Sequence, residues 1–337
     1  MTSQLRITSK HLTLILARLL VIFLFLNSCT KHKSEVLHVG ILSGLNYLTE
    51  IGDGFKSKMT ELGYIDGKNI IYDHQKTEFN TTHYKNVLNS FINNNVDLIF
   101  AFPTEASLEA KLATRGTNIP VIFAHTNVEC SDLIQSTAKP GNNITGVRFP
   151  GPDIGLQSLE IMAELVPKAK RVWIPYQRNY PTVENQLNVM YPLARSMKIK
   201  LEEAPATDAT ELKSLLETHE KATDIGMDAI LIIAEPLCVA PGAFEAMSLF
   251  AKKHKIPILG ALVTIGDHGT LFGINVSQFA TGEQAAILAD KILKGTPAGS
   301  IPVVSAKPYF QLNYKLAQEL GLKVSKGLLS KANEIIR

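Results

Sequence analysis

Two pairs of short segments decide the fold. "NVDLIFA" (95–101) is followed by a helical stretch and then by "NIPVIFA" (118–124). The same order returns as "GMDAILIIA" (226–234), a helical stretch and "KIPILGA" (255–261). Such short, nearly continuous apolar runs are typical of strands that helices cover on both faces of a parallel sheet. The repeated order and the shared Asp and Ile-Pro positions predict two lobes of the same α/β topology.

Segments on either side extend the repeat. "LHVGIL" (37–42) corresponds to "RVWIP" (171–175). "KNIIYD" (68–73) corresponds to "KIKLEEA" (198–204), and the offset stays at about 130 residues. After the second lobe, the stretch 270–295 predicts one further strand that enters a helix. We therefore expect the chain to cross back to the first lobe and to return, so that several crossing strands form a hinge.

Length and composition fit a globular protein of two domains. The chain has 337 residues, of which 45% are hydrophobic and 19% charged. The formal net charge is only +3, and no basic cluster is interleaved with aromatic residues, so we expect no nucleic-acid partner. Three cysteines are too few for a disulfide framework, and no CxxC or HExxH spacing predicts a metal site. We expect no cofactor.

The amino-terminal segment is typical of an export signal. Arg6, Lys10 and Arg18 precede the apolar run Leu19 to Leu26, which is less than half of the roughly 20 residues that span a bilayer. The run ends in Leu-Asn-Ser-Cys, which resembles a bacterial lipobox, so we expect cleavage after residue 28 and lipidation of Cys29. The alternative is an uncleaved signal anchor with an incidental cysteine.

Longer motifs carry a family resemblance. They are "GDGFKSKMTELGYIDGKNIIYDHQ" (52–75), "VDLIFAFPTEASLEAK" (96–111), "IPVIFAHTNV" (119–128), "PGNNITGV" (140–147) and "GEQAAILADKILKG" (282–295). In order and spacing they resemble the type I periplasmic binding proteins of bacterial ABC importers, and more closely the branch for tryptophan and tyrosine uptake. The resemblance implies two Rossmann-like lobes that close on a small ligand, with no bond made or broken. It also implies an ABC permease and an ATPase as partners.

Together, these observations define the expected architecture. We expect an α/β protein whose two Rossmann-like lobes are joined by a multi-strand hinge, with the ligand cleft between the lobes. The lipid anchor places the protein outside the cytoplasm, on the periplasmic side in a Gram-negative cell. The expected boundaries are a signal peptide (1–28), a lipidated tether (29–35), a first lobe (36–148 and 277–303) and a second lobe (149–276 and 304–337).

Candidate ligand-binding residues follow from the sheet type. In open parallel sheets, ligands bind beyond the carboxyl ends of the strands, where helix amino termini favour an anion. For an amino-acid ligand, two threonine hydroxyls are expected to bind the carboxylate, a glutamate the ammonium, and a tyrosine the side chain. The rule selects Ser43, Tyr47, Thr104, Thr126 and Asn127 in the first lobe, and Tyr176, Arg178 and Glu235 in the second.

Each role has a plainer alternative. Thr104 and Glu235 can simply begin helices, and Arg178 can be a solvated loop residue. A weaker hypothesis is that His125, Cys130, Cys238 and Glu235 bind a metal ion, or that the two cysteines cross-link the lobes.

The sequence suggests three classes of function. The first is a lipid-anchored receptor for a small ligand, an amino acid or a similar carboxylate, that feeds an importer. The second is an extracytoplasmic sensor that docks on a signalling partner. The third is a cleft hydrolase, but "GILSG" (40–44) lacks the GxSxG spacing, and no GxGxxG opens the first helix. We therefore expect no enzyme.

Overall fold

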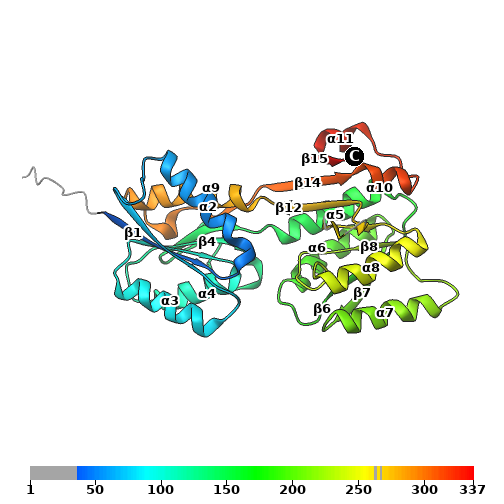
Figure 1. The fold of residues 1–337 in the computed structure, drawn as a ribbon, viewed down its shortest axis with the longest axis horizontal. Coiled ribbons are helices and arrows are strands. Elements are labelled where there is room, and N and C mark those ends of the chain that lie inside the picture. Colours follow the sequence, from blue (N-terminus) through cyan, green and yellow to red (C-terminus); the bar gives the residue numbers. More distant parts are fainter. Residues whose placement is uncertain (1–35, 262–263, 266–267) are drawn as a thin grey trace, which may run out of the picture.

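The computed structural model describes residues 36–261, 264–265 and 268–337. The expected signal peptide, Cys29 and the tether lie outside these residues. Two α/β lobes are arranged side by side along the long axis of the molecule and are joined by extended segments (Figure 1). The predicted fold class is confirmed.

The first lobe is built on a six-stranded parallel sheet with the order β13-β5-β4-β3-β1-β2. Its helices cover both faces, with α2 and α9 on one and α3 and α4 on the other (Figure 1). The short helices η1 (Asn46–Leu48), η2 (Val128–Cys130) and η3 (Ala298–Ser300) lie in its connections. Its strands and longer helices are β1 (Leu37–Ser43), β2 (Ile70–Lys76), β3 (Leu98–Phe102), β4 (Val121–Thr126), β5 (Ile144–Arg148), β13 (Val304–Ser305), α2 (Thr49–Glu61), α3 (Thr81–Asn93), α4 (Thr104–Ala113) and α9 (Gln278–Leu293).

Side chains of the first sheet alternate between two cores. Phe100 of β3 packs with Phe55 of α2 in a stacked pair, 4.5 Å between ring centroids, in the core beneath α2 and α9. The next strand residue, Ala101, belongs instead to the core beneath α3 and α4. Strand residues that follow one another point to opposite faces, so a strand that is covered on both sides is apolar throughout. This explains the continuous apolar runs in the sequence.

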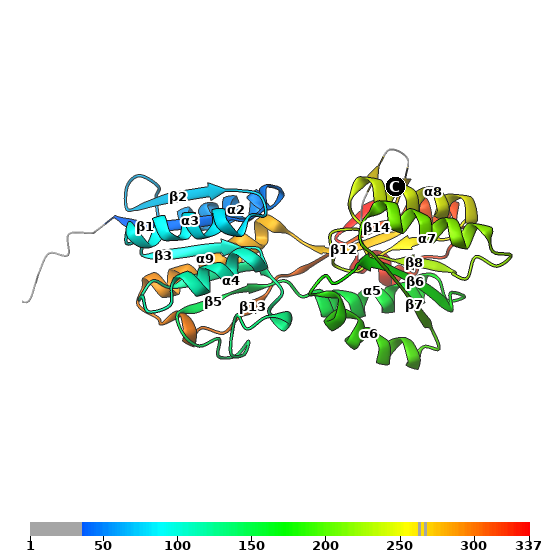
Figure 2. The same ribbon diagram turned by 90° about the horizontal axis from the view of Figure 1, so that it is seen from below.

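The second lobe repeats the first. Its parallel sheet has the order β7-β6-β8-β9, which matches β2-β1-β3-β4, so the repeat predicted from the sequence is confirmed. α5 and α6 cover one face, and α7 and α8 the other (Figure 2). The elements are β6 (Arg171–Gln177), β7 (Lys200–Ala206), β8 (Ala229–Leu231), β9 (Ile258–Leu259), α5 (Gly151–Leu165), α6 (Val183–Ser196), α7 (Ala209–Lys221) and α8 (Pro241–His254).

The carboxyl-terminal part completes the second lobe. β12 pairs antiparallel with β14, which pairs parallel with β15. A bridge between Gly260 and Gly273 connects this group to β9. The remaining elements are β10 (Thr264–Ile265), β11 (His268–Gly269), β12 (Phe272–Val276), β14 (Pro308–Asn313), β15 (Glu334–Ile336), α10 (Tyr314–Glu319) and α11 (Lys326–Lys331).

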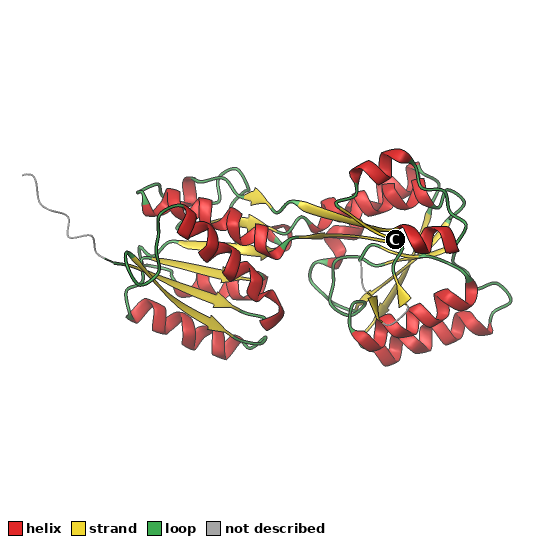
Figure 3. Ribbon diagram, turned by 45° about the horizontal axis from the view of Figure 1, so that its top comes forward, coloured by secondary structure: helices red, strands yellow, loops and turns green. Residues whose placement is uncertain are grey.

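Three segments of the described chain cross between the lobes (Figure 3). They connect β5 to α5, β12 to α9, and β13 to β14. Val304 and Ser305 pair with β5, so the first sheet extends two residues past the expected boundary at residue 303. Arg148, at the end of β5, donates from Nε to Ser305 Oγ at 2.7 Å and pairs with Asp153 of α5 at 2.5 Å. One guanidinium thus connects two of the crossing segments.

Candidate functional site

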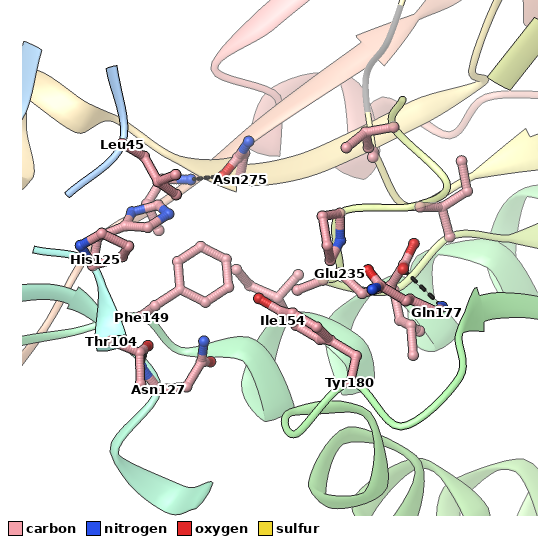
Figure 4. A pocket seen from close by; sticks show the side chains of 18 of the residues that line it. Leu45, Thr104, His125, Asn127, Phe149, Ile154, Gln177, Tyr180, Glu235 and Asn275 are labelled. Carbon is pink, nitrogen blue, oxygen red and sulfur yellow. Dashed lines mark hydrogen bonds between the residues drawn. The ribbon is translucent and has the colours of Figure 1, made fainter. Parts of the chain in front are cut away.

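A cavity of about 900 Å³ lies between the lobes (Figure 4). Loops at the carboxyl ends of the strands of both sheets form its sides, as expected for open parallel sheets. The hinge segments contribute the rest. Its lining residues are Leu45, Tyr47, Leu48, Phe79, Pro103, Thr104, Glu105, His125, Asn127, Phe149, Ile154, Gly155, Ser158, Gln177, Asn179, Tyr180, Pro181, Ile232, Ile233, Ala234, Glu235, Pro236, Val239, Ala240, Gly260, Ala261, Ile274, Asn275, Val276 and Gln278.

On the first-lobe side, Thr104 and Asn127 are connected to each other. Thr104 is the first residue of α4, and its Oγ1 accepts a hydrogen bond from the backbone N–H of Asn127 at 3.1 Å. The hydroxyl therefore does not cap its own helix. The first N–H groups of an α-helix have no partner within the helix and, with the helix dipole, favour an anion. This side of the cavity can accept a carboxylate.

On the second-lobe side, Glu235 is held by backbone donors. Its Oε2 accepts from the N–H groups of Gln177 and Leu237, each at 2.9 Å, and its Oε1 accepts from the N–H of Cys238 at 2.7 Å. The side chain is only 8% exposed. The carboxylate thus connects the end of β6 to the loop between β8 and α8, and it also faces the cavity (Figure 4). The Cys238 thiol also interacts with this carboxylate, so what Glu235 offers to the cavity is its negative charge.

His125 lies at an irregularity of β4. The register with β5 shifts between Ala124 and Thr126, and His125 has φ of 50°, in the left-handed region that few residues other than glycine adopt. Its ring packs against Phe149, with 4.8 Å between centroids. Burial lowers the pKa of His125 to about 4, so the imidazole is neutral at neutral pH.

The structure brings four of the eight predicted site residues to the cavity. These are Tyr47, Thr104, Asn127 and Glu235. Tyr47 is 68% exposed at the mouth of the cavity. The roles assigned to these four stay predictions.

The other four predicted residues lie elsewhere and have protein partners. Buried Ser43 donates to the carbonyl of Leu45 at 3.2 Å. Thr126 Oγ1 donates to the carbonyl of Ala124 at 2.8 Å and lies 3.0 Å from Ser107 Oγ. The Tyr176 hydroxyl donates to Glu203 at 2.6 Å, and Arg178 pairs with Glu211 at 2.5 Å. Because these four residues do not line the cavity, we give them no role in ligand binding.

Hinge residues are the part of the cavity that sequence analysis missed. Phe149 lines it from a crossing segment, and Ile154 of α5 and Ile274, Asn275 and Val276 of β12 line it from the elements next to the crossing segments. The rule that ligands bind beyond the carboxyl ends of parallel strands selects loops of one sheet. It does not select residues on segments that pass from one sheet to the other lobe. The sequence signal that could have indicated these residues is the predicted crossing of the chain between the lobes.

The metal and cross-link hypothesis finds no support in the described residues. Cys238 is buried in the second-lobe core, where its Sγ lies 3.3 Å from the carbonyl oxygen of Pro175. The side chain of Cys130 is not described. Among the described side chains of residues 36–261 and 269–337, no group of three or more His, Cys, Asp or Glu could hold a metal ion. In the same part of the chain, no helix is long and apolar enough to span a bilayer.

The sequence model of the family described as "ABC transporter substrate binding protein" matches residues 40–336. The chain belongs to this family. Its members bind solutes and are not enzymes. Among curated relatives, a tyrosine-binding protein of Clostridioides difficile is 26% identical over 254 residues, which are 75% of this chain and 70% of the relative.

Solved structures of substrate-binding proteins share the fold. One is an ABC domain from Streptococcus pneumoniae in complex with L-Trp, with a TM-score of 0.73, 23% identity, and coverage of 89% of this chain and 99% of that one. Another is the ligand-free, open form of a substrate-binding protein with adhesive properties from Clostridium difficile, with a TM-score of 0.72, 22% identity, and coverage of 89% and 98%. At these identities the likeness concerns the fold alone. The match to the family model confirms the predicted family, the substrate-binding proteins of ABC transporters.

Proposed function

We propose that this substrate-binding protein captures an amino acid with a large apolar side chain between its lobes and delivers it to an ABC permease and its ATPase. The observation that carries the proposal is the composition of the cavity. Most of its lining is apolar, and its few polar groups lie at strand ends of two facing lobes. A tyrosine-binding relative and a structural neighbour in complex with L-Trp support an aromatic ligand.

The charge of the cavity favours a zwitterion. Glu105 and Glu235 are the charged side chains among the described lining residues, which include no lysine or arginine. An ammonium group is attracted to such a site, whereas a second carboxylate on the ligand meets only like charges. The ligand carboxylate is expected at the amino terminus of α4, beside Thr104 and Asn127. The ammonium is expected near Glu235, whose negative charge attracts it.

Closure of the lobes completes the binding. Tyr47 and Phe79 line the cavity and are 68% and 60% exposed, which is unusual for large aromatic side chains. A hinge motion that moves the second lobe toward them covers both rings and the ligand together. The buried apolar area then contributes to affinity only in the closed form. A permease can therefore distinguish the loaded from the empty protein by shape.

The amino-terminal segment supports an extracytoplasmic, lipid-anchored protein. A signal peptide that ends at residue 28 leaves Cys29 for lipidation and residues 30–35 as a short tether. The first described strand, β1, begins at Leu37, directly after this tether. The anchor keeps the binding protein near its permease.

A thermal-shift series on the purified protein tests the ligand class. L-tryptophan, L-tyrosine and L-phenylalanine are expected to raise the melting temperature, whereas L-aspartate and L-glutamate are not, because of the second carboxylate. A ligand at 100 times its dissociation constant adds about 2.7 kcal/mol to the free energy of unfolding.

Two variants locate the site in the same experiment. Thr104→Val removes the hydroxyl in the cavity and is expected to reduce the shift. Arg178→Ala removes a side chain that pairs with Glu211 and does not line the cavity, and it should leave the shift unchanged. Equal shifts with aspartate and tryptophan, or no shift with any aromatic amino acid, would contradict the proposed ligand class.

A further inference from the structure

The unused hydrogen-bonding capacity of His125 is the feature that goes furthest beyond the proposed function. A neutral imidazole has one N–H donor and one acceptor nitrogen. Nδ1 of His125 is buried and has no hydrogen-bond partner. The only interaction of the ring within the described part of the chain is its packing on Phe149. A buried N–H without a partner is rarer than a buried acceptor without one, so the ring proton belongs on Nε2, and Nε2 is the nitrogen that needs an acceptor.

The backbone around His125 presents its side chain to the cavity. In a regular strand, Thr126 would point to the same face as Ala124, which lies in the core beneath α2 and α9, but Thr126 instead contacts Ser107 of α4 on the opposite face. The bulge at residue 125 and its φ of 50° alter the direction of the strand at this point. Bulges of this kind often lie beside binding sites, where they redirect a side chain. Strained backbone at a non-glycine residue likewise concentrates at ligand-binding positions.

The ring also lies beside the expected carboxylate position. His125 is the penultimate residue of β4 and lies two residues before Asn127, whose N–H donates to Thr104 Oγ1 at the end of the neighbouring strand β3. Figure 4 shows His125, Thr104 and Asn127 on the same side of the cavity, across from Gln177 and Glu235. The described lining has no cationic side chain, so donors for an anionic oxygen must be neutral groups. An N–H at Nε2, with the lone pair of Nδ1 left buried, meets this requirement.

We infer that His125 donates a hydrogen bond from Nε2 to the carboxylate of the ligand and thereby selects amino acids over the corresponding amines. This role rests on the proposed function, because it requires an amino-acid ligand. The low pKa of His125 supports it, since a neutral ring needs no counter-ion in the empty protein. Thr104 Oγ1 accepts from the N–H of Asn127, so its O–H remains free to donate to the same carboxylate beside His125.

The test combines two variants with two ligands. His125→Phe keeps an aromatic ring against Phe149 and removes the donor. His125→Asn keeps an N–H donor, and asparagine tolerates positive φ better than most residues. L-tryptophan and tryptamine share the indole and the ammonium, and only tryptophan has the carboxylate. Calorimetric titration of the wild type and both variants gives six dissociation constants, and thermal unfolding without ligand verifies that each variant is folded.

The expected result is specific to the carboxylate. His125→Phe should weaken tryptophan binding by about 10- to 100-fold, as for a lost hydrogen bond to a charged group, and change tryptamine binding by less than about 2-fold. His125→Asn should retain most of the preference for tryptophan. Equal weakening of both ligands, or of neither, would overturn the role of His125 while the amino-acid function stands. A wild type that binds neither tryptophan, tyrosine nor phenylalanine would overturn the function and this role together.

If the His125→Phe variant does not fold, a second measurement on the wild-type protein tests the same role of His125. In wild-type protein labelled with ¹⁵N-histidine, the ring resonances of His125 are assigned by their loss in His125→Asn. Saturating tryptophan should shift the Nε2 resonance, and saturating tryptamine should shift it less. An Nε2 resonance that tryptophan leaves unchanged would overturn the inference.

Discussion

Replacing Gly282 with alanine should lower the free energy of unfolding by about 3 kcal/mol, the upper end of the usual cost of overpacking. Gly282 of α9 faces α2, where an added Cβ would lie 2.0 Å from the carbonyl oxygen of Ile51. From the other side, an added Cβ at Gly54 of α2 would lie 2.1 Å from the carbonyl oxygen of Phe279. Both contacts are with backbone, so the two helices must move apart. Phe55, stacked on the sheet below, would lose contacts as they do.

Gly242→Ala is the matched control. Gly242 also lies in a helix, α8, but the nearest atom to its added Cβ is 3.7 Å away, an ordinary contact. There alanine should be neutral or stabilise the protein by up to about 1 kcal/mol, because glycine is the less favourable helix residue. Chemical denaturation of the three proteins measures both changes. Similar stabilities for the two variants would contradict the backbone packing of α2 on α9.

Removing the carboxylate of Glu235 should have an effect of similar size. Glu235→Ala leaves the N–H groups of Gln177, Leu237 and Cys238 without their acceptor. Each unsatisfied buried donor costs about 1–3 kcal/mol, so the variant should lose roughly 3 kcal/mol or more of stability. The loop between β8 and α8 should also lose its position at the cavity, so ligand affinity should fall together with stability.

Glu105→Ala is the control that separates the effect of the negative charge of Glu235 from the effect of its hydrogen bonds. Glu105 is the other carboxylate of the described cavity lining, and its side chain makes no hydrogen bond within the described residues. Its removal changes the charge of the cavity by the same amount but should cost less than about 1 kcal/mol of stability. Denaturant unfolding of both variants is the measurement. Equal losses would show that Glu235 acts only through its charge.

The fold could be predicted because its signals are local and repeated. Three strands in each lobe are nearly continuous apolar runs, and the order of four strands recurs after about 130 residues. The hinge followed from the extra strand and helix after the second lobe. Element ends differ by a few residues, as in β3, which begins at Leu98, within the predicted strand segment 95–101. Such shifts reflect sheet pairing, which single-segment patterns do not contain.

The site could be predicted only in part, because the end of a strand specifies where a residue lies but not the direction in which its side chain points. Thr126 ends β4 in a place suited to a ligand, yet its hydroxyl turns to Ser107. His125, one residue earlier, lines the cavity because β4 bulges at that point. Neither the bulge nor the pairing of Tyr176 with Glu203 has a signature in the sequence. Tertiary contacts determine the side-chain directions of these residues.

The central claim is that the lobes close on a small ligand held between them. Small-angle X-ray scattering of the purified protein, with and without saturating L-tryptophan, tests it directly. Calorimetry on the same samples establishes saturation. The radius of gyration should be smaller with tryptophan, because closure about the three crossing segments brings the lobes together. Tryptophan that binds stoichiometrically while the radius of gyration stays unchanged would contradict it.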